Sequence, residues 1–278
     1  MVLSSVLFSV MSLGIRLAAG ADSFLTSFIR FAVGAAVVGS LALTGKVQLS
    51  FVNKPLHLLR GLAGAVAVYT SFLAIEKLGI ARGSVISHTF PLFAAIGGAV
   101  FLKERVRPFG WIALAAAIGG VALMRWGELT ASGPAGPSTT LWYGLTLAGS
   151  VCAGLAIVCV RRLTATDSAP AIFMGQSLVG FWLTLVPAAS RPAAFGPSLA
   201  LLLLGIGLAA SAGQLLMTWS YGRVDIATGS LLGMLTPVIN VGIGVFAFGE
   251  AFRPVEAVGA AIVLAACAAV MAPGRGGG

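Results

Sequence analysis

The chain has 278 residues, of which 58% are hydrophobic and 9% are charged, with a mean hydropathy of +1.02 and a formal net charge of +9. Because a soluble globular chain carries about 25% charged residues, this composition argues against a soluble enzyme and indicates a protein of the lipid bilayer. The basic residues are scattered singly at the ends of apolar runs instead of clustered on one face, so we expect no nucleic-acid partner.

Ten apolar runs divide the chain, each close to the roughly 20 residues that cross a membrane as a helix. In chain order we predict spanning helices over 2–19, 23–44, 56–76, 82–102, 108–125, 141–161, 169–188, 198–221, 226–248 and 254–272. The segments between them are short and polar. The predicted fold class is therefore an all-α integral membrane protein with ten transmembrane helices.

The first two spans differ in their polar residues. The first carries Ser4, Ser5, Ser9 and Ser12 and no acidic residue, whereas the second carries Arg30. We interpret Arg30 as the one charge well inside a span, about seven residues or roughly 10 Å from the helix start. Two readings stay open: the guanidinium snorkels to the interface, or it binds a carboxylate or phosphate bidentately.

The fourth span contains the unusual segment RGSVISHTFPLF. Ser84, His88 and Pro91 lie at helical spacing on one face. Proline removes a backbone hydrogen bond and permits a bend, and imidazole is costly to bury without a partner. We predict that His88 lines a wet cavity as a hydrogen-bonding group or as the carrier of a coupling proton. A packing histidine that donates to a neighbouring carbonyl is the alternative.

Residues 80–108 are repeated at 226–254. At a constant offset of 146, nine of these 29 positions are identical, including Pro91 with Pro237, whereas composition alone would give roughly three. We predict two five-helix halves, 1–125 and 141–278, joined by a linker over 126–140. Because five is odd, the second half enters the membrane in the opposite orientation. Such inverted repeats are typical of secondary transporters, with a substrate site where the halves meet.

Other polar and aromatic side chains inside the spans are candidate substrate contacts, because polar groups in lipid tend to face a cavity. The predicted binding residues are Arg30, Tyr69, Ser84, His88, Gln176, Trp182, Gln214, Thr236 and Asn240, and the predicted helix bends are Pro91 and Pro237. The sequence contains no P-loop, HExxH or dinucleotide fingerprint. We therefore predict neither a metal nor an organic cofactor, and no catalytic residue.

The segments PLFAAIGGAVFLKERVRP and PVINVGIGVFAFGEAFRP each place a proline before a small-residue helix that ends in glutamate. They resemble the paired repeats of the drug/metabolite transporter (DMT) superfamily, in its ten-helix EamA branch. TSFIRFAVG and VCVRRL extend this resemblance over nearly the whole chain. The resemblance implies a 5+5 inverted repeat, alternating access and transport of small metabolites.

The predicted function is secondary transport, not catalysis. We expect export of an amino acid or another anionic, zwitterionic or planar metabolite across the inner membrane. An importer of the riboflavin or S-adenosylmethionine type is the alternative among carriers, and a lipid flippase or intramembrane enzyme is the alternative of another class. The expected partners are a small-molecule substrate, the lipid bilayer and, as a candidate coupling ion, the proton. The expected assembly is a monomer or weak dimer.

The basic residues predict the orientation of the chain. With the N-terminus inside, ten of them fall on the inner side (Lys46, Lys54, Arg60, Lys103, Arg105, Arg107, Arg161, Arg162, Arg223 and Arg275). Six fall on the outer side (Arg16, Lys77, Arg82, Arg125, Arg191 and Arg253). Because cytoplasmic loops carry the excess of lysine and arginine, this distribution favours cytoplasmic termini.

This orientation can be tested with single cysteines and an impermeant thiol reagent added outside intact cells. Cysteines placed beside Lys46 and Lys103 should stay unlabelled, and cysteines beside Glu128 and Arg191 should react. The opposite labelling pattern would show that both termini face outward.

Overall fold

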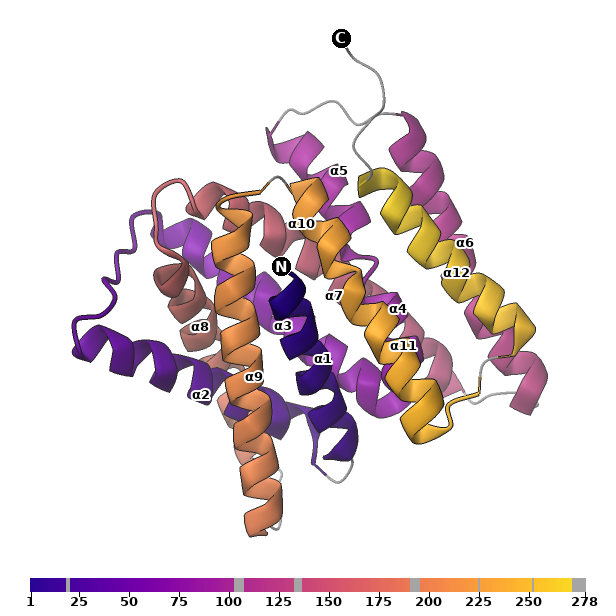
Figure 1. Ribbon diagram of the computed structural model, residues 1–278, viewed down its shortest axis with the longest axis horizontal. Helices are drawn as coiled ribbons and strands as arrows, with labels where there is room; N and C mark the ends of the chain where they lie inside the picture. Colours follow the sequence, from indigo (N-terminus) through magenta and orange to yellow (C-terminus); the bar gives the residue numbers. More distant parts are fainter. Residues whose placement is uncertain are drawn as a thin grey trace.

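The computed structural model describes residues 1–18, 21–102, 108–132, 137–190, 196–224, 226–251 and 253–271. This part of the chain forms twelve α-helices and no strand (Figure 1). They are α1 (Val2–Leu17), α2 (Ser23–Leu43), α3 (Lys54–Leu78), α4 (Ile80–Ser87), α5 (Phe90–Leu102), α6 (Pro108–Ser132), α7 (Pro137–Leu163), α8 (Ala169–Ala189), α9 (Pro197–Tyr221), α10 (Ile226–Gly233), α11 (Leu235–Phe248) and α12 (Pro254–Met271).

These helices confirm the ten predicted spans, two of which are each built from two helices. Five helices, namely α2, α3, α7, α8 and α9, are long and apolar enough to cross a membrane by length and composition. Helices α2, α3 and α8 begin where the side chains of Asp22, Asn53 and Ser168 accept a hydrogen bond from the first turn. Helix α6 continues to Ser132 and α7 begins at Pro137, so helix extends into both ends of the predicted linker.

The fourth span of each half is broken, not merely bent. Helix α4 ends at Ser87 and α5 begins at Phe90, whereas α10 ends at Gly233 and α11 begins at Leu235. The last residues of α4 and α10 are 146 positions apart, so the two breaks obey the sequence repeat. Each break lies just before the repeated proline, whose ring removes one amide donor and clashes with the preceding turn. The predicted continuous helices over 82–102 and 226–248 are corrected accordingly.

Serines of the opposite half satisfy the carbonyl groups at these breaks. The hydroxyl of Ser150 on α7 has one hydrogen to share between the carbonyl oxygens of Ile86 and Ser87, at 3.0 and 3.1 Å, and that of Thr146 in its own helix, at 3.1 Å. The hydroxyl of Ser5 on α1 donates to the carbonyl oxygen of Leu232 at 3.1 Å. Because lipid offers no hydrogen bonds, a broken helix is stable in a membrane only where protein or water satisfies its backbone. Of the serines in the first span, Ser5 has this structural role.

The two halves interlock instead of lying side by side as separate bundles. Equivalent helices meet across the interface, α2 against α8 and α6 against α12. Helix α1 packs on α9 in the same relation in which α7 packs on α3. Figure 1 shows α6 and α12 together at one edge of the bundle and α2 and α8 toward the other. This pairing is the pattern expected of a 5+5 inverted repeat.

Glycine permits the closest of these contacts. A Cβ atom at Gly120 on α6 would lie 2.7 Å from the carbonyl oxygen of Gly259, and one at Gly259 on α12 would lie 2.6 Å from that of Gly120. The two helices therefore touch backbone to backbone, as small residues allow in membranes.

The substitution Gly120→Ala should lower the free energy of unfolding by about 1–3 kcal/mol, because neither backbone can rotate away from the added methyl group. Gly119→Ala is the matched control, since a Cβ at Gly119 meets no atom within 4 Å. This control should be neutral or slightly stabilising through its helix propensity. Thermal unfolding of both variants in detergent measures the difference, and equal effects would contradict the close backbone contact.

Candidate functional site

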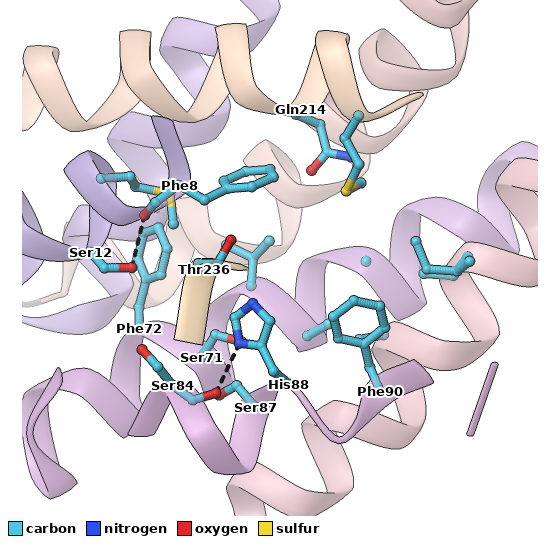
Figure 2. Close-up of a pocket in the computed structure, with 18 of the residues that line it drawn as sticks. Phe8, Ser12, Ser71, Phe72, Ser84, Ser87, His88, Phe90, Gln214 and Thr236 are labelled. Atoms are coloured by element: carbon cyan, nitrogen blue, oxygen red, sulfur yellow. Dashed lines mark hydrogen bonds between the residues drawn. The ribbon is translucent and has the colours of Figure 1, made fainter. Parts of the chain in front are cut away.

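A cavity lies between the two halves, close to the break in the fourth span (Figure 2). Its lining comes from α1, α2, α3, α4, α5, α7, α8, α9 and α11, so both halves contribute. The volume is about 170 Å³, which is on the order of ten times the space that one water molecule requires. The cavity can therefore admit a small solute.

The walls are mainly apolar, with a few polar groups placed among them. Aromatic and methionine side chains provide much of the apolar surface, namely Phe8, Met11, Phe72, Phe90 and Met217. The charged groups are Arg30 and Arg60, and the described lining contains no aspartate or glutamate. A mostly apolar cavity with a few placed polar groups is typical of small-molecule sites.

Arg30 does not snorkel to the membrane surface. Its residue is 3% exposed, and Nη2 donates to the side-chain oxygen of Gln214 at 3.4 Å. The guanidinium also lies over the ring of Phe31, 5.1 Å from its centre. Because α2 and α9 belong to different halves, this hydrogen bond crosses their interface.

Arg60 is a second buried arginine in the same cavity. It is 3% exposed, and Nη2 donates to the side-chain oxygen of Gln176 on α8 at 2.9 Å. The sequence interpretation counted Arg60 among the charges at the inner ends of helices, so its prediction that Arg30 is alone inside a span is wrong. Gly64, one turn later, was the available signal: a Cβ there would lie 2.0 Å from Nη1 of Arg60.

Both arginine–glutamine pairs join the first half to the second: one connects α2 to α9 and the other connects α3 to α8. Gln176 stands 146 residues after Arg30, so the repeat places an amide in one half where the other has a guanidinium. Only one nitrogen of each arginine is used in these pairs. The Nε and Nη1 atoms of Arg30 and Arg60 are buried without a hydrogen-bond partner among the described residues, as is Nε2 of Gln214. Buried cationic donors without partners favour an anionic ligand.

His88 occupies the junction between α4 and α5 and lines the cavity. Its Nδ1 atom lies 2.8 Å from the carbonyl oxygen of Ser84. Since a carbonyl only accepts, Nδ1 must carry the hydrogen, and Nε2 of the neutral ring is left as an acceptor. Figure 2 shows the ring directed into the cavity, toward Thr236.

The structure brings six of the nine predicted binding residues to the cavity: Arg30, Ser84, His88, Gln176, Gln214 and Thr236. The other three lie elsewhere. Tyr69 stacks on Phe24 with ring centres 4.1 Å apart, and Trp182 is 68% exposed on the outer surface of α8. Asn240 lies behind the wall and donates to the hydroxyl of Ser84 at 2.7 Å. Where a helix is apolar all round, sequence periodicity does not identify its inner face.

Glu250 ties the halves together at one end of the molecule. Its two carboxylate oxygens accept hydrogen bonds from the amides of Ile80 and Ala81, at 2.9 and 3.0 Å, and Oε1 lies 3.5 Å from Nε of Arg16. Gly79 makes this approach possible, because it has a φ of +88° and a Cβ there would lie 2.5 Å from Oε1. A carboxylate of one half thus caps the positive end of α4 in the other.

An ion pair adds a second contact between the halves at the same end. Nη2 of Arg82 on α4 lies 2.7 Å from Oε2 of Glu256 on α12. The same nitrogen donates to the carbonyl oxygen of Ala251 at 2.9 Å. Both contacts join the first half to the second.

Asp167 makes the corresponding tie at the opposite end, in the turn between α7 and α8. Its Oδ1 accepts from the amide of Val52 at 3.0 Å and lies 3.3 Å from Nε2 of His57. Burial raises the pKa of Asp167, but hydrogen bonds from Thr166 and Val52 and the adjacent ring of His57 lower it more, so the pKa lies below its usual range. The carboxylate is therefore ionised at neutral pH while it bridges the loops of both halves.

Two inverted five-helix halves around a shared cavity, tied by contacts between the halves at both ends, define a membrane carrier. The sequence model of the EamA-like transporter family matches residues 1–126 and 140–272, so the chain belongs to this family. The chain is 27% identical to the pseudopaline exporter CntI of Pseudomonas aeruginosa, in two strains, over 99% of this chain and 95% of the relative. A solved crystal structure superposes with a TM-score of 0.68 at 20% identity, over 96% of this chain and 93% of that one.

Glu250→Gln should loosen the end that Glu250 holds closed, because the amide keeps the side-chain size but loses the charge that faces Arg16 and the start of α4. The readout is the labelling rate of Ser12→Cys, a cavity position on α1, in a chain whose three native cysteines are replaced. Labelling should become several-fold faster. Glu76→Gln, at the same end but paired with the adjacent Lys77, is the control and should leave the rate unchanged. Equal rates in both variants would exclude the closing role of Glu250.

Proposed function

We propose that this chain exports a small anionic or zwitterionic metabolite across the inner membrane by alternating access. Both termini are placed in the cytoplasm in this proposal, following the distribution of basic residues. The substrate occupies the cavity between the halves, and its contacts are the six predicted residues that line it together with Arg60. The molecule is not an enzyme in this proposal.

One observation carries the proposal. Two buried guanidinium groups face the same cavity with unpartnered donors, and the described lining has no carboxylate to neutralise them. Burying a charge without a partner is costly, whereas a guanidinium binds a carboxylate or phosphate with two parallel hydrogen bonds. An anionic solute reduces this cost, and a cationic solute adds to it. The arrangement therefore favours anions and zwitterions over cationic drugs.

The direction of transport is proposed from the relative. The printed name of the Pseudomonas aeruginosa protein describes an exporter, and that protein aligns with nearly the whole of this chain. Planar solutes belong to the predicted substrate class, and vitamins belong to the alternative importer. Trp182 and Tyr69 do not line the cavity, so aromatic stacking with either kind of solute would depend on the phenylalanines of the lining. A monomer is sufficient for this mechanism, since both halves of the carrier lie in one chain.

His88 is the proposed carrier of a coupling proton, if transport is driven by a proton gradient. His88 is the histidine among the described lining residues. Its Nδ1 atom is bonded to the carbonyl oxygen of Ser84, and its Nε2 atom takes no part in that hydrogen bond. Imidazole is the side chain that changes charge near neutral pH. The same atom also suits a hydrogen-bond donor of the substrate, so the two roles have to be separated by experiment.

Purified protein in liposomes tests the proposal with three labelled probes: glutamate as an anion, alanine as a zwitterion and choline as a cation. We expect saturable flux of the anion or zwitterion and none of choline. Arg30→Gln should weaken the apparent affinity for glutamate, which carries two carboxylates, by about tenfold or more. Arg30→Lys should weaken it less, because lysine keeps the charge and loses the bidentate fork. Small and equal effects of both changes would contradict substrate binding by Arg30.

The same vesicles separate the other readings. Lipid scrambling without solute flux would indicate a flippase, and hydrolysis without flux would indicate an enzyme. With an imposed pH gradient, His88→Gln should abolish uphill accumulation and leave downhill exchange partly intact. Full accumulation in that variant would exclude His88 as the proton carrier.

A further inference from the structure

The cavity contains two cationic groups, and a single carboxylate can compensate only one of them. Arg30 and Arg60 are each held by one hydrogen bond to a neutral amide, and each keeps Nε and Nη1 buried and unpartnered among the described residues. An amide oxygen offers a dipole but no compensating charge. A singly charged anion would therefore leave one buried guanidinium without a counter-charge, and its desolvation would remain uncompensated.

The two guanidinium groups are anchored on different helices. Arg30 lies on α2 and Arg60 on α3. Their glutamine partners, on α9 and α8, also hold them at two separate points.

The polar lining offers a hydrogen-bond acceptor as well. The side-chain oxygens of Gln214 and Gln176 are already engaged by the arginines. Nε2 of His88 has the lone pair of a neutral imidazole because Nδ1 is fixed as the donor to Ser84. A donor on the substrate, such as an N–H or O–H group, would find its partner here.

We infer that the transported solute is a small dianion, with one anionic group for each arginine and a hydrogen-bond donor for His88. This inference rests on the proposed function and narrows its substrate class. The cavity volume of about 170 Å³ sets the size to on the order of ten non-hydrogen atoms, counting about 10–15 Å³ for each water-sized group. Short-chain dicarboxylates that carry a hydroxyl group meet all three conditions, whereas an amino group would be protonated at neutral pH and would add a third positive charge.

A matched five-carbon series tests this inference without any mutation. The probes are valerate with one carboxylate, glutarate with two, 2-hydroxyglutarate with two and a hydroxyl group, and cadaverine with two cationic groups. Binding to the purified protein is measured by calorimetry at constant ionic strength, since exposed charges are screened by salt. Glutarate should bind about tenfold or more tightly than valerate, 2-hydroxyglutarate more tightly than glutarate, and cadaverine not at all.

Substitutions then test the role of each arginine and of His88 separately. Arg60→Gln should reduce glutarate affinity to the level of valerate and leave valerate within about threefold, because Arg30 still compensates one charge. Arg30→Gln should do the same. Arg60→Lys, which retains the charge, should recover part of the preference for two carboxylates. His88→Phe should remove the advantage of 2-hydroxyglutarate over glutarate without abolishing the binding of either.

The outcomes distinguish this inference from the proposed function. If wild-type protein binds and transports valerate or alanine as well as glutarate, the dianion class is wrong and a carrier of simple anions or zwitterions remains. If Arg60→Gln leaves the preference for glutarate unchanged, Arg60 is not an anchor and the inference fails. If cadaverine binds and none of the anions does, both the inference and the proposed function are wrong.

Discussion

The absence of hydrogen bonds in lipid is the constraint on which this architecture depends. A helix broken in the middle of a membrane exposes carbonyl groups that only other protein groups or enclosed water can satisfy. Here Ser150 and Ser5 come from the first helix of the opposite half and bond to the turns that precede the breaks. Neither half therefore has a complete fourth span by itself. The same arrangement leaves a polar, irregular backbone beside the cavity, where a solute can be bound.

Much of the fold could be predicted because the controlling signals are periodic and local. The ten apolar runs reflect the thickness of the bilayer, and the repeat containing Pro91 and Pro237 shows directly that the halves are related. The full breaks were harder to predict, because proline permits anything from a slight bend to a new helix. How completely each helix is interrupted depends on the serine that satisfies its carbonyl groups. That serine comes from another part of the sequence, and no local pattern identifies it.

The site was predictable only in part, for a different physical reason. Polar residues in lipid are rare enough to be noticed, so Arg30, His88 and Gln214 could be selected without coordinates. Arg60 follows closely after a helix start, where an arginine ordinarily extends to the headgroups. Its burial results from the space left by Gly64 and from the amide of Gln176 on another helix. Trp182 does not line the cavity as predicted. An aromatic ring is equally stable against lipid and inside protein, so its presence in a span does not show which way it faces.

The ion pair between Arg82 and Glu256 breaks the symmetry of the two halves. An offset of 146 relates these positions to Thr228 and Gly110, and neither residue carries a charge. One end of the carrier therefore has an electrostatic tie that the repeat does not reproduce at the other. Two conformations related by the repeat would be equally populated if the halves were identical, whereas each 1.4 kcal/mol of difference changes their ratio about tenfold. In the proposed alternating-access cycle, this ion pair would favour the conformation in which its own end is closed, before any gradient or substrate acts on the carrier.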